Sequence, residues 1–482
     1  MVEKAKFRLI VGLALVLLPG VVFGGEEITK DVYAKRRAAL MAGMKEGIAV
    51  FRGSDPAQRN SDITYSPYRQ NSDFLYLTGY ELPEAACIIA PGAEKKFILF
   101  VKPENVISAQ WFGDLPGIEG AVADFGADEA FPFEDFEKIL AEKMEGCGTV
   151  FSDFADKTMQ ELIVSISGKM EAGRPAAFAD AGAIVHAMRM IKEPGEIELI
   201  RKAVVATCRG HVEAMKAIRP GMSEREIEAI YRYVFARSGA WSFAFEPIVA
   251  SGPNSTVYHC EPTERPVQAG ELVMIDMGAE YENYASDVTR VYPVSGKFTP
   301  DQRRMYEIAL GMEELVIAAM KPGAKVADVV KGAEAYAKEE LFKLGLITDK
   351  GSAWQHLLYY FPYIGHGVGL DVHDAGDYDY AKTVLKPGMV FAIEPMIYIG
   401  DNLVGSFRKV AMKHFKVPEK EVDDFLAATK PAFDKYKGIA GRIEDDILIT
   451  ETGNEVLSIG LIKKPADIEA MMAVRSRLEE AL

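Results

Sequence analysis

The sequence predicts an α/β fold with more than one domain, and three observations lead to it. The chain has 482 residues, which corresponds to two or three domains of about 150 residues each. Its composition, 49% hydrophobic and 26% charged, is that of a globular protein and excludes a disordered, collagen-like or coiled-coil chain. Short apolar runs alternate with helical stretches early in the chain, and a turn followed by a strand and a carboxylate occurs twice in the second half.

The first element is an export signal. Lys4, Lys6 and Arg8 precede the apolar run of residues 9–18, which is about half the ~20 residues that a membrane-spanning helix needs. Small residues follow, and then a polar start to the next segment. We therefore predict a cleaved signal peptide at residues 1–24 and a secreted or periplasmic protein. The alternative is an uncleaved N-terminal anchor; no other stretch is long and apolar enough to span a membrane, so we expect no stable span after processing.

Residues 25–186 are predicted to form a compact α/β domain. Apolar runs at residues 48–51, 86–89 and 97–101 are separated by Pro/Gly turns, and residues 133–144 have a helical pattern. Strands that alternate with helices are typical of this class.

A second domain is predicted at residues 187–482. From Glu196 to Ile218 the apolar residues recur at helical spacing, and Pro194 stands just ahead as a start signal. His211 lies on the same apolar stripe. We interpret it as a packed core side chain and not as a metal ligand.

The second domain contains a weak internal duplication. Residues 270–276 (GELVMID) and 388–394 (GMVFAIE) each begin at a glycine and reach a carboxylate six positions later. Each follows a helical pattern opened by a Pro-Gly pair, at 220–221 and at 322–323. If this is not chance similarity, two αβ halves face each other across a shared site.

Charge and cysteine content exclude two classes of function. The formal charge of −16, from 71 acidic and 55 basic residues, would repel a phosphate backbone, so we expect no nucleic-acid partner. The four cysteines form no CxxC pair, which excludes a disulfide framework or a zinc ribbon. A metal site would have to use other ligands.

Two aspartates indicate such a site. Apolar segments 272–278 and 284–292 are joined by a polar turn and predict an antiparallel hairpin. The alternation of side chains along strands allows Asp276 and Asp287 to share one face. Two desolvated carboxylates that point together are costly unless a cation compensates them. The alternative, that one of them is a surface residue, fits either aspartate alone but not both.

Further donors follow along the chain. His366 stands between glycines, His373 and Asp374 come soon after, and Glu394 ends an apolar strand. Glu444 lies in residues 441–449, which are predicted to form one strand with Arg442 on the same face. Four carboxylates and one imidazole suit a pair of Mn²⁺, Co²⁺, Zn²⁺ or Fe²⁺ ions about 3.5–4 Å apart. The set consists of Asp276, Asp287, His366, Glu394 and Glu444.

The order of these residues resembles that of the dinuclear pita-bread metallopeptidases, which include methionine aminopeptidase, prolidase and aminopeptidase P. The matching segments are 273–278 (VMIDMG), 286–290 (SDVTR), 365–374 (GHGVGLDVHD), 393–395 (IEP) and 442–445 (RIED). Residues 68–80 (YRQNSDFLYLTGY) are similar to the N-terminal domain of Xaa-Pro aminopeptidases and prolidases, which methionine aminopeptidases lack. The resemblance implies a pita-bread catalytic domain with pseudo-twofold symmetry, preceded by a smaller α/β domain.

The resemblance also implies roles for the metal ligands. Asp276 and Asp287 would bind metal, Asp287 and Glu444 would bridge two divalent ions, and His366 and Glu394 would complete the set. Mn²⁺ is the first expectation, with Co²⁺ or Zn²⁺ as alternatives. Two such ions lower the pKa of a bridging water, so that hydroxide is available near neutral pH.

Four residues would act on the substrate. By resemblance, His259 contacts the tetrahedral intermediate and His373 holds the peptide carbonyl. Glu394 would pass a proton to the leaving nitrogen, and Arg442 would orient a carboxylate or support the site.

Two departures from the family pattern stand out. The family's aminopeptidases P and prolidases usually carry a histidine four residues before the metal-binding one, where this chain has Pro362. The interval between Glu394 and Glu444 is also unusually long and holds a charged, helix-prone insertion at about 401–437. This insertion would be a lid that limits substrate length, or a surface excursion without a role.

The predicted function is a metal-dependent aminopeptidase that hydrolyses the N-terminal Xaa-Pro bond of a peptide. The alternatives within the fold are a prolidase that acts on dipeptides, a broader aminopeptidase, or a creatinase-like amidinohydrolase, against which the intact ligand set argues. From a different class, a catalytically silent homologue would use the cleft to bind peptides. The resemblance further implies a homo-oligomer, either a dimer or a tetramer.

Overall fold

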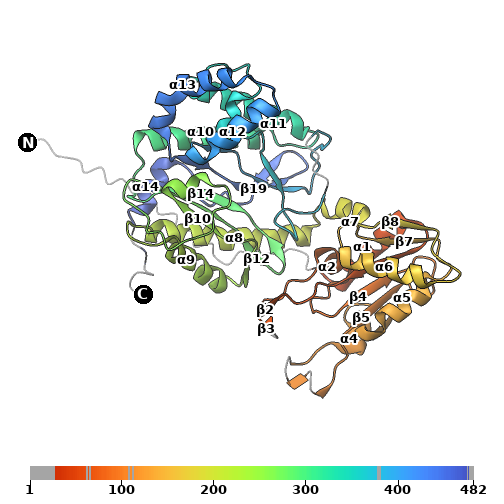
Figure 1. Cartoon of the computed structure of the whole chain (residues 1–482). Coiled ribbons are helices and arrows are strands. Elements are labelled where there is room, and N and C mark those ends of the chain that lie inside the picture. The colour runs from red at the N-terminus through yellow and green to blue at the C-terminus, as the bar shows by residue number, and fades with distance from the viewer. Residues whose placement is uncertain are drawn as a thin grey trace, which may run out of the picture.

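The computed structural model describes residues 28–60, 63–64, 67–106, 109–110, 113–376, 381–474 and 476. The predicted signal peptide lies outside these residues. The described chain forms two parts, which lie side by side in Figure 1, the N-terminal one in red to yellow and the C-terminal one in green to blue. Among the helices of these ranges, none combines the length and the apolar character needed to cross a membrane.

The N-terminal part is a mixed sheet with helices on both faces, in the strand order β6-β5-β4-β1-β7-β8. Its strands are β1 (Ile48–Arg52), β4 (Ala86–Ile89), β5 (Phe97–Val101), β6 (Glu129–Pro132), β7 (Thr149–Ser152) and β8 (Ala177–Asp180). Its helices are α1 (Lys30–Met44), α2 (Ser72–Thr78), α4 (Gly117–Ala123), α5 (Phe136–Met144), α6 (Lys157–Lys169) and α7 (Gly182–Arg189), with a 3-10 turn at Phe133–Asp135. A short pair, β2 (Gln58–Asn60) and β3 (Ile63–Thr64), lies outside the sheet.

The central strands of this sheet are buried on both faces. Ile48 and Val50 of β1 belong to the apolar layer that contains α5 and α6. The alternate residues, Ala49 and Phe51, belong to the layer that contains α1, α2 and α7. A strand covered on both faces has a continuous apolar sequence, which explains the short unbroken runs that predicted it.

The C-terminal part is built from antiparallel sheets and long helices. Its first half contains α8 (Pro194–Ala217), α9 (Glu224–Arg237), β9 (Ser242–Phe243), β10 (Ile248–Ser251), a 3-10 turn η2 (Gly252–Thr256), β11 (Leu272–Met277), β12 (Ala279–Tyr281), β13 (Tyr284–Ala285) and β14 (Val288–Pro293). Its second half contains α10 (Pro300–Ala319), α11 (Val326–Lys343), η3 (Gln355–Leu358), β15 (Gly365–Gly367), β16 (Val390–Ile393), β17 (Met396–Tyr398), α12 (Asp401–Lys413), α13 (Glu419–Tyr436), β18 (Ala440–Arg442), β19 (Asp445–Ile449), β20 (Asn454–Val456) and α14 (Pro465–Met472).

Equivalent sheets occur in the two halves. The order β10-β11-β14 in the first half corresponds to β15-β16-β19 in the second, where β20 adds an outer strand, and all these pairs are antiparallel. Helix α8 packs on β12, β13 and β14, and α10 packs on β16, β17 and β18. Both helices begin with a proline and a capping box, and the start of α8 at Pro194 confirms the predicted start signal.

The backbone repeats the duplication in detail. The N–H of Gly221 donates to the carbonyl of Val267, and the N–H of Gly323 donates to the carbonyl of Leu385, each at 2.9 Å. Both glycines have positive φ, 98° and 84°, a conformation that other residues adopt only with strain. The two Pro-Gly pairs therefore mark equivalent turns, and the predicted duplication is present in the fold.

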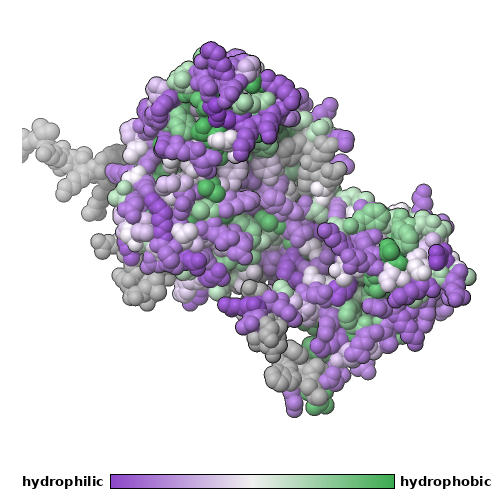
Figure 2. Space-filling model, in the orientation of Figure 1, coloured by the Kyte–Doolittle hydropathy of each residue, from purple (hydrophilic) through white to green (hydrophobic). Residues whose placement is uncertain are grey.

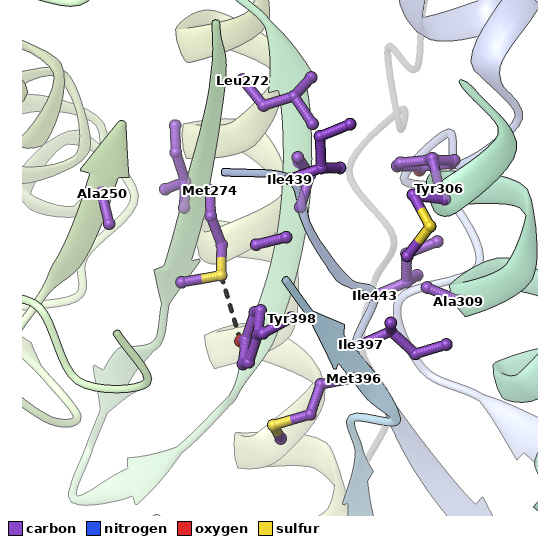
Figure 3. Close-up of a cluster of buried hydrophobic side chains, with 14 of the residues drawn as sticks. Ala250, Leu272, Met274, Tyr306, Ala309, Met396, Ile397, Tyr398, Ile439 and Ile443 are labelled. Carbon is purple, nitrogen blue, oxygen red and sulfur yellow. Dashed lines mark hydrogen bonds between the residues drawn. The ribbon is translucent and has the colours of Figure 1, made fainter. Parts of the chain in front are cut away.

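An apolar core joins the two halves (Figure 3). Met274 of β11 faces Tyr398 of β17, whose hydroxyl donates to the Met274 sulfur at 3.3 Å. Ala309 of α10 packs closely on β18, because a Cβ at Gly441 would lie 3.2 Å from the Ala309 Cβ. The halves also contact each other directly, because β11 and β14 of the first half lie against β18 of the second.

The predicted insertion folds as the helical pair α12 and α13. Phe407 of α12 and Phe425 of α13 pack on Trp354, with ring centroids 5.7 and 5.1 Å away. The outer faces of the pair are rich in charge, including the pairs Lys420–Asp424 and Lys430–Asp434. The face of the described residues seen in Figure 2 is mostly hydrophilic in the same way.

Candidate metal centre

The structure places all five predicted metal ligands in or next to strands of the two half-sheets. Asp276 is in β11 and His366 is in β15. Each of the others adjoins a strand: Asp287 precedes β14, Glu394 follows β16 and Glu444 precedes β19. All five side chains are buried.

The predicted hairpin brings the two aspartates to one face. Asp276 of β11 pairs with Thr289 of β14, and Asp287 stands two residues before Thr289, so the two aspartates share a side of the sheet. The β12–β13 turn at Glu282 and Asn283 has φ values of 46° and 68°, as in the tight turns that connect twisted strands.

The donor atoms converge around the imidazole of His366. Its Nε2 is 3.4 Å from Oδ2 of Asp287 and 3.6 Å from Oε1 of Glu394. One donor atom each from Asp287, His366 and Glu444 lie within 4.8 Å of one another. Nδ1 of His366 lies 3.1 Å from the carbonyl of Gly367; with the proton on Nδ1 donated to that carbonyl, Nε2 is left to face the carboxylates as a metal ligand.

Burial shifts the pKa values of Asp287, Glu394 and His366 toward their uncharged forms. Burial, and then the charges of Glu444 and Asp276, raise the pKa of Asp287 well above its usual value. Burial raises the pKa of Glu394 to about 7, although Arg442 opposes the shift. Burial also lowers the pKa of His366 to about 3, so the imidazole is neutral.

The carboxylates also have unsatisfied acceptors. Oδ1 of Asp276, Oδ1 of Asp287 and Oε1 of Glu444 are buried and accept no hydrogen bond. Buried carboxylate oxygens without partners are costly unless a cation lies among them. Oxygen-rich donors with one imidazole suit a pair of divalent ions, so the residues present fit the predicted dinuclear centre.

Arg442 lies beside these carboxylates, but not in the predicted way. Its Nη2 is 2.8 Å from Oδ2 of Asp276, and its Nη1 is 3.4 Å from Oε2 of Glu394. The prediction of one continuous strand across residues 441–449 was wrong. Arg442 ends β18, which pairs with β17, whereas β19 pairs with β16, and Glu444 lies in the break between them. The guanidinium thus approaches from a separate two-stranded sheet.

The two predicted substrate-contacting histidines lie on the exposed side of the site. The ring of His373 stacks on the ring of His366, with centroids 3.9 Å apart and planes at 24°. His259 is exposed in the turn that follows η2. Burial, and then the charge of His259, lower the pKa of His373.

Two residues that were not predicted from the sequence hold the ligands in place. The hydroxyl of Thr289 donates to Oε2 of Glu444 at 2.6 Å. Oδ2 of Asp446 accepts from the backbone N–H of Asp287 at 3.0 Å. Thr289 could have been found, because it shares a strand face with Asp287; the contact of Asp446 depends on the break in the strand and could not.

The neighbouring residues agree with Glu444 as the ligand among three consecutive acids. Asp445 faces away and accepts from Nη2 of Arg290 at 2.6 Å and from Lys463 at 2.7 Å.

Pro362, at the place of the expected histidine, lies next to Phe361, which is 59% exposed. The position of the expected histidine thus holds a residue whose side chain can neither donate nor accept a hydrogen bond.

Comparisons with known proteins agree with this geometry. The metallopeptidase family M24 model matches residues 198–451, and the aminopeptidase P N-terminal domain model matches residues 33–151. A Xaa-Pro aminopeptidase from Escherichia coli (strain K12) is 35% identical over 461 residues, which are 92% of this chain and 98% of that protein. A Xaa-Pro dipeptidase from Homo sapiens is less similar, at 29% identity over 91% of this chain and 90% of its own.

Solved structures show the same fold. Proline aminopeptidase P II from Yersinia pestis superposes with a TM-score of 0.83 at 33% identity, over 93% of this chain and 100% of that chain. The Pseudomonas aeruginosa aminopeptidase PepP gives a TM-score of 0.80 at 33% identity, over 93% and 98% of the two chains. The chain belongs to metallopeptidase family M24 and carries the N-terminal domain of aminopeptidase P.

Proposed function

We propose that this protein is a metal-dependent aminopeptidase that hydrolyses the peptide bond between an N-terminal residue and a following proline. The observation that carries the proposal is the group of buried carboxylates with unpartnered oxygens around Nε2 of His366. Relatives that this chain covers almost completely are Xaa-Pro aminopeptidases, and the dipeptidase is a more distant relative.

Two divalent ions would be held by the converging ligands Asp276, Asp287, His366, Glu394 and Glu444. When bound, such ions polarise the scissile carbonyl and make hydroxide available near neutral pH. We expect Mn²⁺ as the resident metal, with Co²⁺ or Zn²⁺ as the alternatives; affinity order alone does not select among them.

The chain's own residues would position the substrate and move the proton. Glu394, held by Arg442, would take a proton from the attacking water and deliver it to the proline nitrogen as the bond breaks. On the exposed side, His373 would hold the peptide carbonyl and His259 would contact the tetrahedral intermediate, where the oxygen develops charge. Proline needs such a dedicated site, because its nitrogen carries no N–H for recognition and its φ is fixed.

The helical pair α12–α13 is proposed to limit substrate length. Nδ2 of Asn402 in α12 donates to the carbonyl of Thr256 at 3.3 Å, so the pair contacts the η2 turn three residues before His259. Removing residues 401–437 should then raise the activity on long Xaa-Pro peptides relative to dipeptides. An unchanged length preference would mean that the pair is only a surface excursion.

Metal stripping and refilling tests the proposed activity. We expect protein treated with a chelator to lose the release of the first residue from Xaa-Pro-Yaa peptides. Activity should return with Mn²⁺, Co²⁺ or Zn²⁺ and reach its maximum at two ions per chain. A protein that binds no metal, or that cleaves no Xaa-Pro peptide or dipeptide with any of these ions, would instead be a silent peptide-binding homologue.

Export is a separate proposal that rests on residues 1–24 alone. N-terminal sequencing of the protein from its native cells should begin at residue 25, in the periplasmic or secreted fraction. An intact Met1 in the membrane fraction would support the uncleaved anchor.

A further inference from the structure

The loop that carries His373 is compact and bonded to itself. The N–H of Gly369 donates to the carbonyl of Asp371 at 3.0 Å, and the N–H of Asp374 donates to the carbonyl of Gly367 at 2.9 Å. A Cβ at Gly369 would lie 2.4 Å from Oδ2 of Asp374, so the loop leaves no room for a side chain there. The position of the exposed His373 ring is therefore set by how this loop is held.

Asp374, the next residue, is held by two buried cations. It accepts from Nη2 of Arg189 at 2.6 Å and from Nζ of Lys192 at 2.7 Å, and the side chains of Arg189, Lys192 and Asp374 are 3%, 1% and 1% exposed. Arg189 ends α7, and Lys192 lies in the short connection to α8, where the two parts of the chain meet (Figure 1). A buried charge that loses its partner is strongly destabilising, so these ion pairs hold Asp374 in one place.

Asp371, on the other side of His373, contacts the same guanidinium. It accepts from Nη2 of Arg189 at 2.7 Å and from the hydroxyl of Ser72 at 2.6 Å. Arg69 adds a bond from Nη2 to the carbonyl of Leu370 at 2.6 Å. The residues that flank His373 are thus fixed by side chains of the N-terminal part.

Arg189 is itself anchored in the N-terminal part. Its Nη1 donates to Oδ1 of the buried Asp73 in α2 at 2.7 Å, and Oδ2 of Asp73 lies 2.9 Å from Nε2 of His186. The backbone N–H of Lys192 donates to the carbonyl of Gly388, the turn before the strand that leads to Glu394. One short segment is therefore bonded to the N-terminal part, to the His373 loop and to the strand of a metal ligand.

We propose that Arg189 and Lys192 are positioning residues for His373, which they hold over the metal centre through Asp374 and Asp371. The segment that joins the two parts of the chain thereby supports the active site, with Asp73 and Ser72 of the N-terminal part behind it. This inference rests on the proposed function, in which His373 contacts the substrate.

A double-mutant cycle separates positioning from general support. We expect Arg189→Met to lower kcat for an Xaa-Pro-Yaa peptide by about tenfold or more, with little change in KM or in bound metal. In a His373→Ala background the same substitution should change kcat less than about twofold, because the residue it acts through is gone. Equal losses in both backgrounds, or a loss of metal, would overturn the proposal.

Matched variants keep the test decisive. Arg201→Met is the control, because it removes another arginine that makes two 2.6 Å bonds to one carboxylate, Glu455, away from the loop; its kcat should stay unchanged. If Arg189→Met does not fold, Asp371→Asn and Lys192→Met replace it in the cycle. Arg189→Lys should have a higher kcat than Arg189→Met but a lower one than the wild type. Lysine keeps the charge but lacks the planar fork of donors that reaches Asp73, Asp371 and Asp374 together.

A readout independent of activity distinguishes the two proposals. Hydrogen exchange of residues 367–374 should be faster in Arg189→Met than in the wild type and in Arg201→Met, with exchange elsewhere unchanged. Unchanged loop exchange would overturn the positioning role. A wild-type protein that cleaves no peptide would overturn the proposed function, and a His373→Ala variant with full kcat would overturn the proposed role of His373.

Discussion

Asp287 and Glu444 hold equivalent positions in the two halves of the catalytic domain. Asp287 directly precedes β14, which pairs antiparallel with β11, and Glu444 directly precedes β19, which pairs antiparallel with β16. The first residues of these strands, Val288 and Asp445, pair with Met277 and Ile393. The N–H of Glu444 donates to the carbonyl of Thr289 at 3.1 Å, which joins the two halves where these carboxylates meet. Each half of the duplication therefore supplies one carboxylate to the candidate metal centre from an equivalent position.

Of the consecutive acids Glu444, Asp445 and Asp446, only Glu444 is expected to be essential for metal binding. Glu444→Gln should lower bound metal by about tenfold or more, since it removes a ligand charge. Asp446→Asn should keep the metal, because burial raises the pKa of Asp446 well above its usual value and an amide oxygen can still accept from Asp287. Metal analysis of the dialysed variants measures this, and equal metal loss in both would contradict the assignment.

Removing a ligand carboxylate should also stabilise the metal-free protein. Asp287→Asn relieves repulsion between desolvated carboxylates, and we expect a gain of about 1–3 kcal/mol in the free energy of unfolding with chelator present. With metal added, the order should reverse, because the wild type gains stabilisation from binding that the variant lacks. Thermal melts with and without metal show this; a variant less stable in both conditions would mean that the group has only a structural role.

The hydroxyl of Thr289 is expected to tune the metal site. Thr289→Val removes the 2.6 Å bond to Glu444 with little change in shape and should weaken metal binding about 10–100-fold. Thr289→Ser keeps the hydroxyl and serves as the control. Titration of the stripped proteins with Mn²⁺ gives the affinities, and similar values for the Val and Ser variants would refute the role.

His211 is expected to matter for stability and not for catalysis. It is buried, with Tyr231, Tyr292 and the carbonyl of Val288 as partners, and burial, followed by the charge of Arg290, lowers its pKa to about 3. The folded protein then binds fewer protons than the unfolded one between pH 3 and 6.5, so this group's stabilisation is lost as the pH falls.

The pH dependence isolates this group. Between pH 6.5 and about 5 the wild type should lose about 2 kcal/mol of stability relative to His211→Gln, in which nothing titrates at this position. Denaturant unfolding at the two pH values measures the difference. A pH-independent difference, or a loss of bound metal in the variant, would contradict a purely structural role.

Much of the fold could be predicted because an unbroken apolar run indicates a strand that is buried on both faces. The unbroken runs at 48–51 and 97–101 correspond to β1 and β5, which are buried on both faces. The spacing of Asp276 and Asp287 predicted a shared face because alternation along a strand is local geometry. The prediction of one strand at 441–449 was wrong because β18 pairs with β17, whereas β19 pairs with β16. The break between them depends on these distant partner strands, which the local sequence does not indicate.

Long-range ion pairs could not be predicted for a related reason. Asp73, Arg189 and Asp374 are far apart in sequence, and each looks like an ordinary surface charge beside its own neighbours. Their contacts arise only when the two domains pack, so the support of the His373 loop became visible only in three dimensions.

The most direct test of the account compares two peptides that differ only at the second residue. We would measure kcat/KM for Xaa-Pro-Yaa and Xaa-Ala-Yaa with the stripped protein, before and after Mn²⁺, Co²⁺ or Zn²⁺ is returned. We expect cleavage only with metal and a preference for proline of about tenfold or more, despite Pro362. Equal cleavage of both peptides would contradict the proline specificity, and no cleavage with any metal would contradict the enzyme itself.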